Sequence, residues 1–146
     1  MSLEQLFNQD RLSKQKTSRE EVRSLFEVIE RLLGDAEVAG VSTDGRFISA
    51  YGAVLQAATV LIRCHGYRTK GIGHHFTTFQ ALKMVLPQEG QLISYFESCR
   101  SKRNLADYTQ AGAVSEKEVK DLMRETRTFI SLVREIILSD FPEYGP

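Results

Sequence analysis

Residues 46–75 read RFISAYGAVLQAATVLIRCHGYRTKGIGHH, an apolar segment that ends in a short basic one. At helical spacing, the apolar part (residues 46–65) carries one wide apolar stripe and, next to it, a second face of small side chains. The stripe consists of Phe47, Tyr51, Val54, Leu55, Ala58, Leu61 and Ile62, and the small face consists of Ala50, Ala53, Ala57, Val60 and Cys64. A helix that is apolar over this much of its surface is buried on most sides, so we expect it at the centre of a helical bundle.

Amphipathic segments on both sides of this central helix predict the helices that surround it. Two long ones begin at a serine three positions before a glutamate, Ser18 with Glu21 and Ser115 with Glu118, which is the spacing of a capping box. The other predicted elements are a short helix at residues 3–9, a linker at 11–17, helices at 76–86 and from about 90, and a tail at 140–146. No segment alternates in the way of a strand. We therefore expect one all-α domain over residues 1–146, an up-and-down bundle of four main helices with one or two short extra helices.

The charge of the chain is balanced overall but unevenly distributed. The net charge is zero, whereas residues 45–88 carry five basic residues and no acidic one. This segment could form a local basic surface, or its lack of acids could simply reflect a buried helix. Cys64 and Cys99 both fall on apolar helical faces, so we expect reduced core residues. The N-terminus lacks a signal-peptide pattern and no apolar run reaches about 18 residues, which predicts a cytoplasmic protein without a membrane segment.

The first candidate site is the segment RNLADY at residues 103–108. The apolar face that carries Phe96 and Cys99 reaches Arg103 four residues later. A guanidinium group turned toward a bundle interior needs a partner, and Asp107, one helical turn further on, can provide it. A structural ion pair and a functional site are both compatible with this spacing.

Together with the order of the helices, this hexapeptide resembles the HEPN superfamily, small α-helical bundles found in prokaryotic toxin–antitoxin modules and related systems. Members with ribonuclease activity carry an arginine, usually followed by a polar residue, and then a histidine after four to six intervening residues. Arg103 and Asn104 match the first two positions, and Tyr108 stands at the place of the histidine. The segment 66–75 is also similar to a loop of one HEPN subgroup, in which a Gly-Tyr-Arg and His run follows the central helix.

The resemblance implies a binding or regulatory module that associates with nucleotide, RNA or a partner protein such as a nucleotidyltransferase. The alternative is a metal-independent endoribonuclease in which Arg103 stabilises the scissile phosphate and Asn104 positions it. His74 or His75 would then replace the missing histidine as acid or base. Because a tyrosine such as Tyr108 has an ordinary pKa of about 10, we expect weak or no cleavage by the isolated protein.

The resemblance also implies a homodimer in which the arginine motifs of two chains face a shared cleft. The small face of the central helix would let another helix approach closely. That helix could come from a second chain, or it could belong to the same chain.

The basic loop after the central helix is the second candidate site. The candidates for binding RNA or another anion are Arg68, Lys70, His74 and His75 in this loop, together with Arg100 and Lys102 near Arg103. If His74 and His75 begin the next helix, its free backbone N–H groups could hold a phosphate; the alternative is a purely structural loop. The histidines lack a cysteine pair or a nearby carboxylate, so neither a metal nor another cofactor is predicted. The sequence shows no interleaving of basic and aromatic residues of the kind that stacks single-stranded bases.

Overall fold

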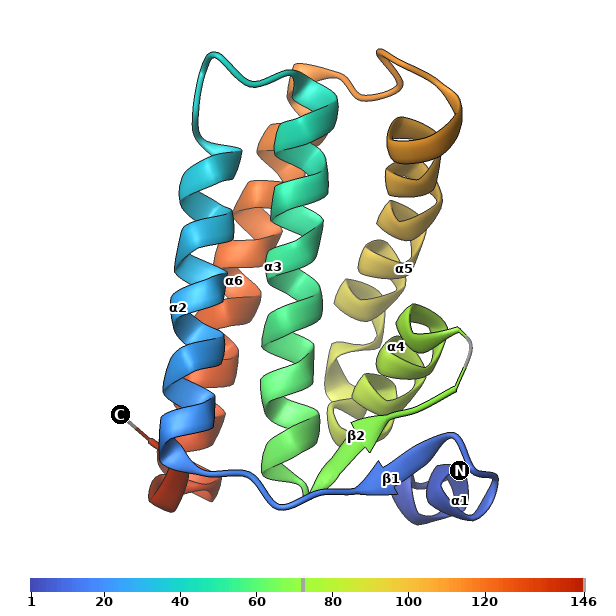
Figure 1. The fold of residues 1–146 in the computed structure, drawn as a ribbon, viewed down its shortest axis with the longest axis vertical. Helices are drawn as coiled ribbons and strands as arrows, with labels where there is room; N and C mark the ends of the chain where they lie inside the picture. Colours follow the sequence, from blue (N-terminus) through green and yellow to red (C-terminus); the bar gives the residue numbers. More distant parts are fainter. Residues whose placement is uncertain (72, 146) are drawn as a thin grey trace.

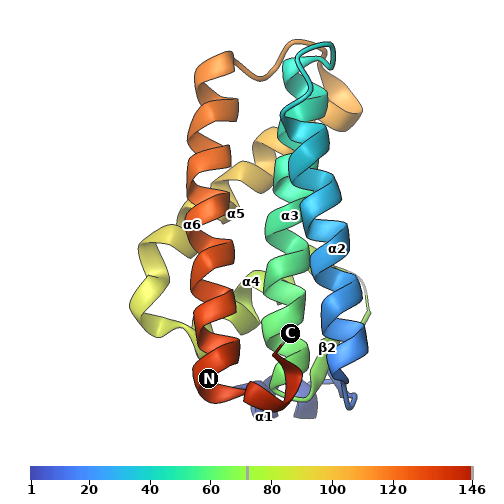
Figure 2. The ribbon, with the colours of Figure 1, turned by 90° about the vertical axis from the view of Figure 1, so that its left-hand side faces the viewer.

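The computed structural model describes residues 1–71 and 73–145. Over these residues the chain forms an up-and-down bundle whose long helices are α2 (Arg19–Ala36), α3 (Thr43–Cys64), α5 (Gly90–Asn104) and α6 (Glu116–Asp140). Figure 1 shows α3 between α2 and α5, with α6 behind. Figure 2, turned by 90°, shows α6, α3 and α2 running side by side in front of α5. The predicted all-α bundle is confirmed.

The central position of α3 follows from its two apolar faces. Apart from Leu55, which is partly buried, every residue of the predicted stripe is buried, and so is every residue of the small face. Helices α2 and α6 cover most of α3, while α4 and α5 pack against it from the other side. The small face is therefore covered by helices of the same chain, and it offers no surface to a second copy.

By length and mean hydropathy, α3 would be able to cross a membrane. The expectation that no segment is long and apolar enough for a membrane span is therefore corrected. However, 61% of its most apolar window is buried by the rest of the protein. This is the position of a core helix, because a helix that faces lipid would expose that surface.

Of the two predicted capping boxes, one is complete and one is half formed. The hydroxyl of Ser115 accepts a hydrogen bond from the backbone N–H of Glu118 at 3.1 Å, and the Glu118 carboxylate accepts one from the N–H of Ser115 at 3.0 Å. The hydroxyl of Ser18 likewise accepts from the N–H of Glu21 at 3.1 Å. The Glu21 carboxylate, however, pairs with Arg63 at 2.5 Å. A guanidinium partner is stronger than a neutral backbone N–H, so the carboxylate turns away from the cap.

A small sheet joins the N-terminal segment to the basic loop, so the expectation of a chain without strands is wrong. Strand β1 (Leu12–Lys14) pairs antiparallel with β2 (Tyr67–Thr69), and Leu12 lies opposite Thr69. Leu12 is buried, which fixes the predicted linker against the bundle. Strands this short show no alternation that sequence periodicity can detect. The sheet holds helix α1 (Leu3–Asn8) beneath the bundle in Figure 1.

Helix α4 (His74–Val85) begins two residues before the predicted start, and the short turn η1 (Pro87–Glu89) connects it to α5. Its N-cap is Gly73, with φ of +81°, a conformation that favours glycine. In Figure 1, α4 lies beside the lower part of α5. Ile72, in the middle of the basic loop, and Pro146, the last residue of the predicted tail, lie outside the described residues.

At the other end of α5, the chain forms a π-helical turn, η2 (Leu105–Thr109), before the loop to α6. The start of α3 anchors this loop. The Asp44 carboxylate accepts hydrogen bonds from the backbone N–H groups of Gly112 at 2.7 Å and Val114 at 3.1 Å. After α6, the tail forms a short 3-10 turn, η3 (Pro142–Tyr144).

Candidate functional site

The side chain of Arg103 contacts several other residues of the RNLADY motif. Helix α5 continues through Asn104, so Arg103 occupies the face of the helix that the sequence predicts. Its side chain is 20% exposed, and its guanidinium group lies 3.3 Å from the Asp107 carboxylate. The Arg103–Asp107 ion pair expected from their spacing is therefore present. Among the described residues, the buried Nε of Arg103 has no hydrogen-bond partner, so the guanidinium group has unused donor capacity.

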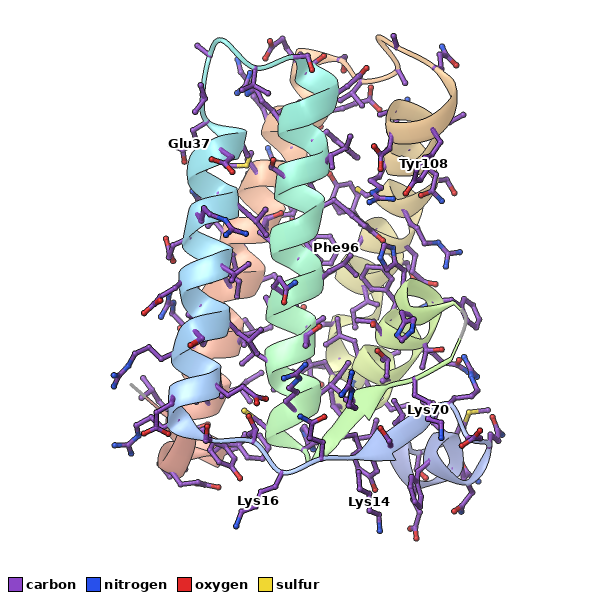
Figure 3. All side chains as sticks on the ribbon, in the orientation of Figure 1. Lys14, Lys16, Glu37, Lys70, Phe96 and Tyr108 are labelled. Carbon is purple, nitrogen blue, oxygen red and sulfur yellow. The ribbon has the colours of Figure 1, made fainter. Side chains whose placement is uncertain are left out.

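The π-helical turn η2 brings Tyr108 to the same guanidinium group. The hydroxyl of Tyr108 accepts a hydrogen bond from Nη1 of Arg103 at 3.4 Å, and its ring centroid lies 5.5 Å from the Arg103 guanidinium carbon. A π-helical turn closes over five residues and not four, so residues five apart come to one side of the chain. Nη1 also donates to the side-chain oxygen of Asn104 at 3.4 Å. Tyr108 is 75% exposed, and Figure 3 shows it at the outer edge of the bundle.

His75 is the histidine that the fold brings to the arginines of α5. Its Nδ1 lies 3.3 Å from the hydroxyl of Tyr51, which is buried in α3. The pKa of His75 is lowered from its ordinary value, first by burial and then by the positive charges of Arg103 and Arg100. Burial also raises the pKa of Tyr51, which therefore keeps its proton. At neutral pH, His75 is accordingly an uncharged imidazole held by a phenol.

Phe76, the next residue, lies close to two guanidinium groups. The Arg11 guanidinium carbon is 5.5 Å from the centroid of its ring, and that of Arg100 is 5.7 Å away. Both distances are within the range of a cation–π contact. Arg11 also donates a hydrogen bond to the Thr77 hydroxyl at 3.1 Å, which holds its long side chain over α4. The ring of Phe76 nevertheless remains 48% exposed.

Two groups of contacts, that of Phe76 with Arg11 and Arg100 and that of Tyr108 with Arg103, make up what we call the arginine–aromatic face: Arg11, Phe76, Arg100, Arg103 and Tyr108. Arg100 and Arg103 are three residues apart on α5 and so share one side of the helix. Both arginines lower the pKa of His75, the residue before Phe76, so both groups lie near the start of α4. The sequence showed no interleaving of basic and aromatic residues because these residues are far apart in the chain: Arg11 precedes β1, and the others lie on α4, α5 and η2. Phe76 and Tyr51 were expected as apolar helix residues, and no sequence signal marked Arg11.

His74 and Arg68 lie apart from this face. His74 contacts the hydroxyl of Thr69, with its Nδ1 3.1 Å from that oxygen. Arg68 donates a hydrogen bond to the side chain of Gln15 at 3.2 Å. Both residues instead line a cavity between α3, β2 and the start of α4, together with Arg63. The structure thus places the two neighbouring histidines differently: His74 lines the cavity, and His75 lies near the arginines of α5.

The two candidate lysines serve local contacts. Lys70 pairs with the Asp10 carboxylate at 2.6 Å, and Figure 3 shows it beside the N-terminal segment. Lys102 pairs with Glu118 at 3.1 Å and donates to the carbonyl of Ala113 at 3.1 Å. Lys102 therefore joins the end of α5 to the start of α6 and the loop before it.

Metal and thiol chemistry find little support in the described part of the chain. Among residues 1–71 and 73–145, no three histidine, cysteine or acidic side chains come together in a way that could hold a metal ion. Cys64 and Cys99 are buried and free, as predicted. Burial raises the pKa of each thiol to about 11, so neither is a thiolate nucleophile at neutral pH.

Comparison with known proteins identifies the family. No curated protein and no solved structure gives a significant match to the chain. The family model described as HEPN_SAV_6107-like HEPN matches residues 36–134, which include α3, α4, α5, η2 and most of α6. The match thus contains the arginine motif and the basic loop, and it covers well over half of the chain. The protein belongs to the HEPN superfamily, in the HEPN_SAV_6107-like family.

Proposed function

We propose that this HEPN domain is a module that binds single-stranded RNA across the arginine–aromatic face. The observation that carries the proposal is the exposed side chain of Phe76, with the guanidinium groups of Arg11 and Arg100 close to its ring. An exposed ring beside guanidinium groups offers a base a surface for stacking and offers the adjoining phosphates a positive charge. Tyr108 over Arg103 repeats this arrangement, so the face can take more than one nucleotide.

The ion pair of Arg103 with Asp107 sets how strongly this arginine can bind phosphate. The Asp107 carboxylate neutralises part of its charge in the free protein. A phosphate that approaches Arg103 must compete with Asp107, which lowers the affinity of this position. Arg100 has no carboxylate partner among the described residues, so it is the stronger phosphate ligand of the two.

His75 adds an imidazole group to this region, and its role depends on which ring nitrogen carries the proton. If the protonated hydroxyl of Tyr51 donates to Nδ1, the neutral ring carries its remaining proton on Nε2 and can donate a hydrogen bond. This tautomer suits binding of an anionic ligand. The opposite tautomer, in which Nδ1–H donates to Tyr51, leaves Nε2 free as a base.

The experiment is an equilibrium titration of a fluorescent, single-stranded 12-nucleotide RNA at several salt concentrations. Phe76→Ala should weaken binding by about 1–3 kcal/mol, the usual value of one stacked base. Arg100→Gln should reduce the slope of log K against log salt by about 0.7, the value for one phosphate contact on a single strand. Arg23→Gln is the matched control, because Arg23 is an exposed arginine on α2, across the bundle. Unchanged affinity in both test variants would contradict the proposal.

A metal-independent endoribonuclease is the second candidate function, favoured by the neutral His75 near Arg103. In it, His75 would take the proton of the 2′-hydroxyl, whose oxygen attacks the phosphorus while the 5′-oxygen leaves and takes a proton from water. Arg103 would stabilise the charge on the scissile phosphate, with Asn104 and Tyr108 beside it. The test is cleavage of the same RNA in EDTA. Cleavage lost in His75→Gln and kept in His74→Gln would establish this function, and absence of cleavage at high protein concentration would exclude it.

The proposed module acts as a homodimer in the cytosol, and a nucleotidyltransferase is its proposed protein partner. Support for the dimer comes from an exposed apolar side chain next to the arginine motif. Leu105, the first residue of η2, is 41% exposed. A second copy placed there would shield this side chain and bring two arginine motifs to one cleft, with Tyr108 left open to RNA.

A further inference from the structure

A cavity of about 230 Å³ lies between the second half of α3, strand β2 and the first residue of α4. Its polar lining consists of Gln56, Thr59, Arg63, Arg68, Thr69 and His74. No carboxylate is among the described residues that line it. A cavity with basic and neutral polar walls is suited to an anionic ligand.

The positive charge of the cavity exceeds what its neighbours neutralise. Arg63 pairs through Nη1 with Glu21 at 2.5 Å. The hydrogen bond from Arg63 is the largest cause that lowers the pKa of Glu21, so this carboxylate neutralises Arg63. Arg68 is exposed, forms no ion pair among the described residues and donates to the neutral Gln15 at 3.2 Å. One net positive charge therefore remains at the cavity.

The start of α4 adds partial positive charge to the same place. His74, the first residue of this helix, lines the cavity. The N-cap residue Gly73 has no side chain, so the first backbone N–H groups have no side-chain cap. The N-terminal end of a helix with free N–H groups stabilises an anion. Arginine N–H groups and the N-terminal end of a helix around one cavity are donors of the kind that bind the oxygens of a phosphate.

We propose that this cavity binds a terminal phosphate, carried by a nucleoside monophosphate or by the 5′ end of an RNA. The RNA form of the proposal rests on the proposed function and deepens it. Successive residues of α4 serve the two sites, because His74 lines the cavity while His75 lies with Arg100 and Arg103. A strand that crosses the arginine–aromatic face can thus end with its 5′-phosphate in the cavity. The cavity would make the module selective for RNA ends.

The experiment measures binding of AMP, of a 5′-phosphorylated 12-nucleotide RNA and of the same RNA with a 5′-hydroxyl. The cavity variant is Arg68→Gln with His74→Gln, and the face variant is Phe76→Ala. Lys16→Gln is the charge control, because Lys16 is exposed and Figure 3 shows it pointing away from the bundle. Thermal melting checks that each variant is folded.

We expect the affinity of the wild type for the 5′-phosphorylated RNA to be about tenfold higher than for the 5′-hydroxyl RNA, because the phosphate would form charge-assisted hydrogen bonds in the cavity. The cavity variant should lose this preference and its AMP binding, while its affinity for 5′-hydroxyl RNA stays unchanged. AMP binding without a preference between the two RNAs would assign the cavity to the free nucleotide. Equal binding of both RNAs together with no AMP binding would overturn the inference and leave the proposed function standing. Loss of 5′-hydroxyl RNA binding in the face variant tests the proposed function separately.

Discussion

The hydroxyl of Tyr51 lies 3.3 Å from Nδ1 of His75, so the buried centre of α3 is in direct contact with the first turn of α4. This contact fixes the position of the start of α4, and with it Phe76, the ring that Arg11 and Arg100 approach. It also keeps His75 within reach of the charges of α5. The core of the bundle therefore determines the geometry of the arginine–aromatic face.

The stability of the protein should fall as the pH drops from about 7 to about 5. Burial lowers the pKa of both His65 and His75 below the ordinary value of 6.5. Between the ordinary and the lowered pKa, the unfolded chain binds more protons than the folded one, so the free energy of unfolding decreases with falling pH. Urea unfolding at pH 5.5 and 7.5 measures the effect. His75→Gln should reduce the difference between the two pH values, and an unchanged difference would contradict the burial of this imidazole.

Asp107→Asn should strengthen RNA binding. The substitution removes the carboxylate that pairs with Arg103 at 3.3 Å and leaves an amide of the same shape. The affinity should rise a few-fold and the salt slope should steepen by up to about 0.7, since one more arginine can contact phosphate. Asp35→Asn, at an exposed position on α2, is the control for the change in net charge. Weaker binding in Asp107→Asn would mean that Asp107 orients Arg103 for the ligand and does not compete with it.

Leu61→Ala should destabilise the fold by about 2–5 kcal/mol, the usual cost of truncating a buried leucine. Leu61 is completely buried in the central helix. Leu138→Ala makes the same change at a position that is 61% exposed, and it should cost less than about 1 kcal/mol. Urea unfolding of both variants gives the comparison. Equal losses would contradict the central position of α3.

Sedimentation at micromolar concentration should give a dimer of the 16.5 kDa chain. Leu105→Glu should shift the protein toward monomer, because it places two new charges in the two-fold interface proposed at η2. Leu138→Glu, on the exposed side of α6, should leave the dimer intact. A wild-type monomer at every concentration would end the dimer proposal.

The fold could be predicted from the sequence where a long helix repeats one apolar pattern. The stripe from Phe47 to Ile62 and the serine that caps α6 determine the positions of α3 and α6, and the structure agrees with both. The pairing of β1 with β2 was not readable, because three residues are too few to show a period. The half-formed cap at Ser18 depends on Arg63, which lies far along the chain.

Local spacing predicted the Arg103–Asp107 ion pair, since both partners lie on one stretch of helix. The contacts of Phe76 and His75 could not be predicted in this way. Each depends on how α4 packs against α3 and α5, which no pattern within a single segment records. The choice between His74 and His75 likewise depends on where the first turn of α4 begins.

Ultraviolet cross-linking of the protein to a single-stranded RNA, followed by peptide mass spectrometry, tests the central claim most directly. If RNA lies across the arginine–aromatic face, nucleotide adducts will form on the exposed rings of Phe76 and Tyr108, and Phe76→Ala will remove the first adduct. Tyr144, an aromatic residue on the other side of the bundle near α2, serves as the internal control. Adducts on Tyr144 with none on Phe76 or Tyr108 would contradict the account.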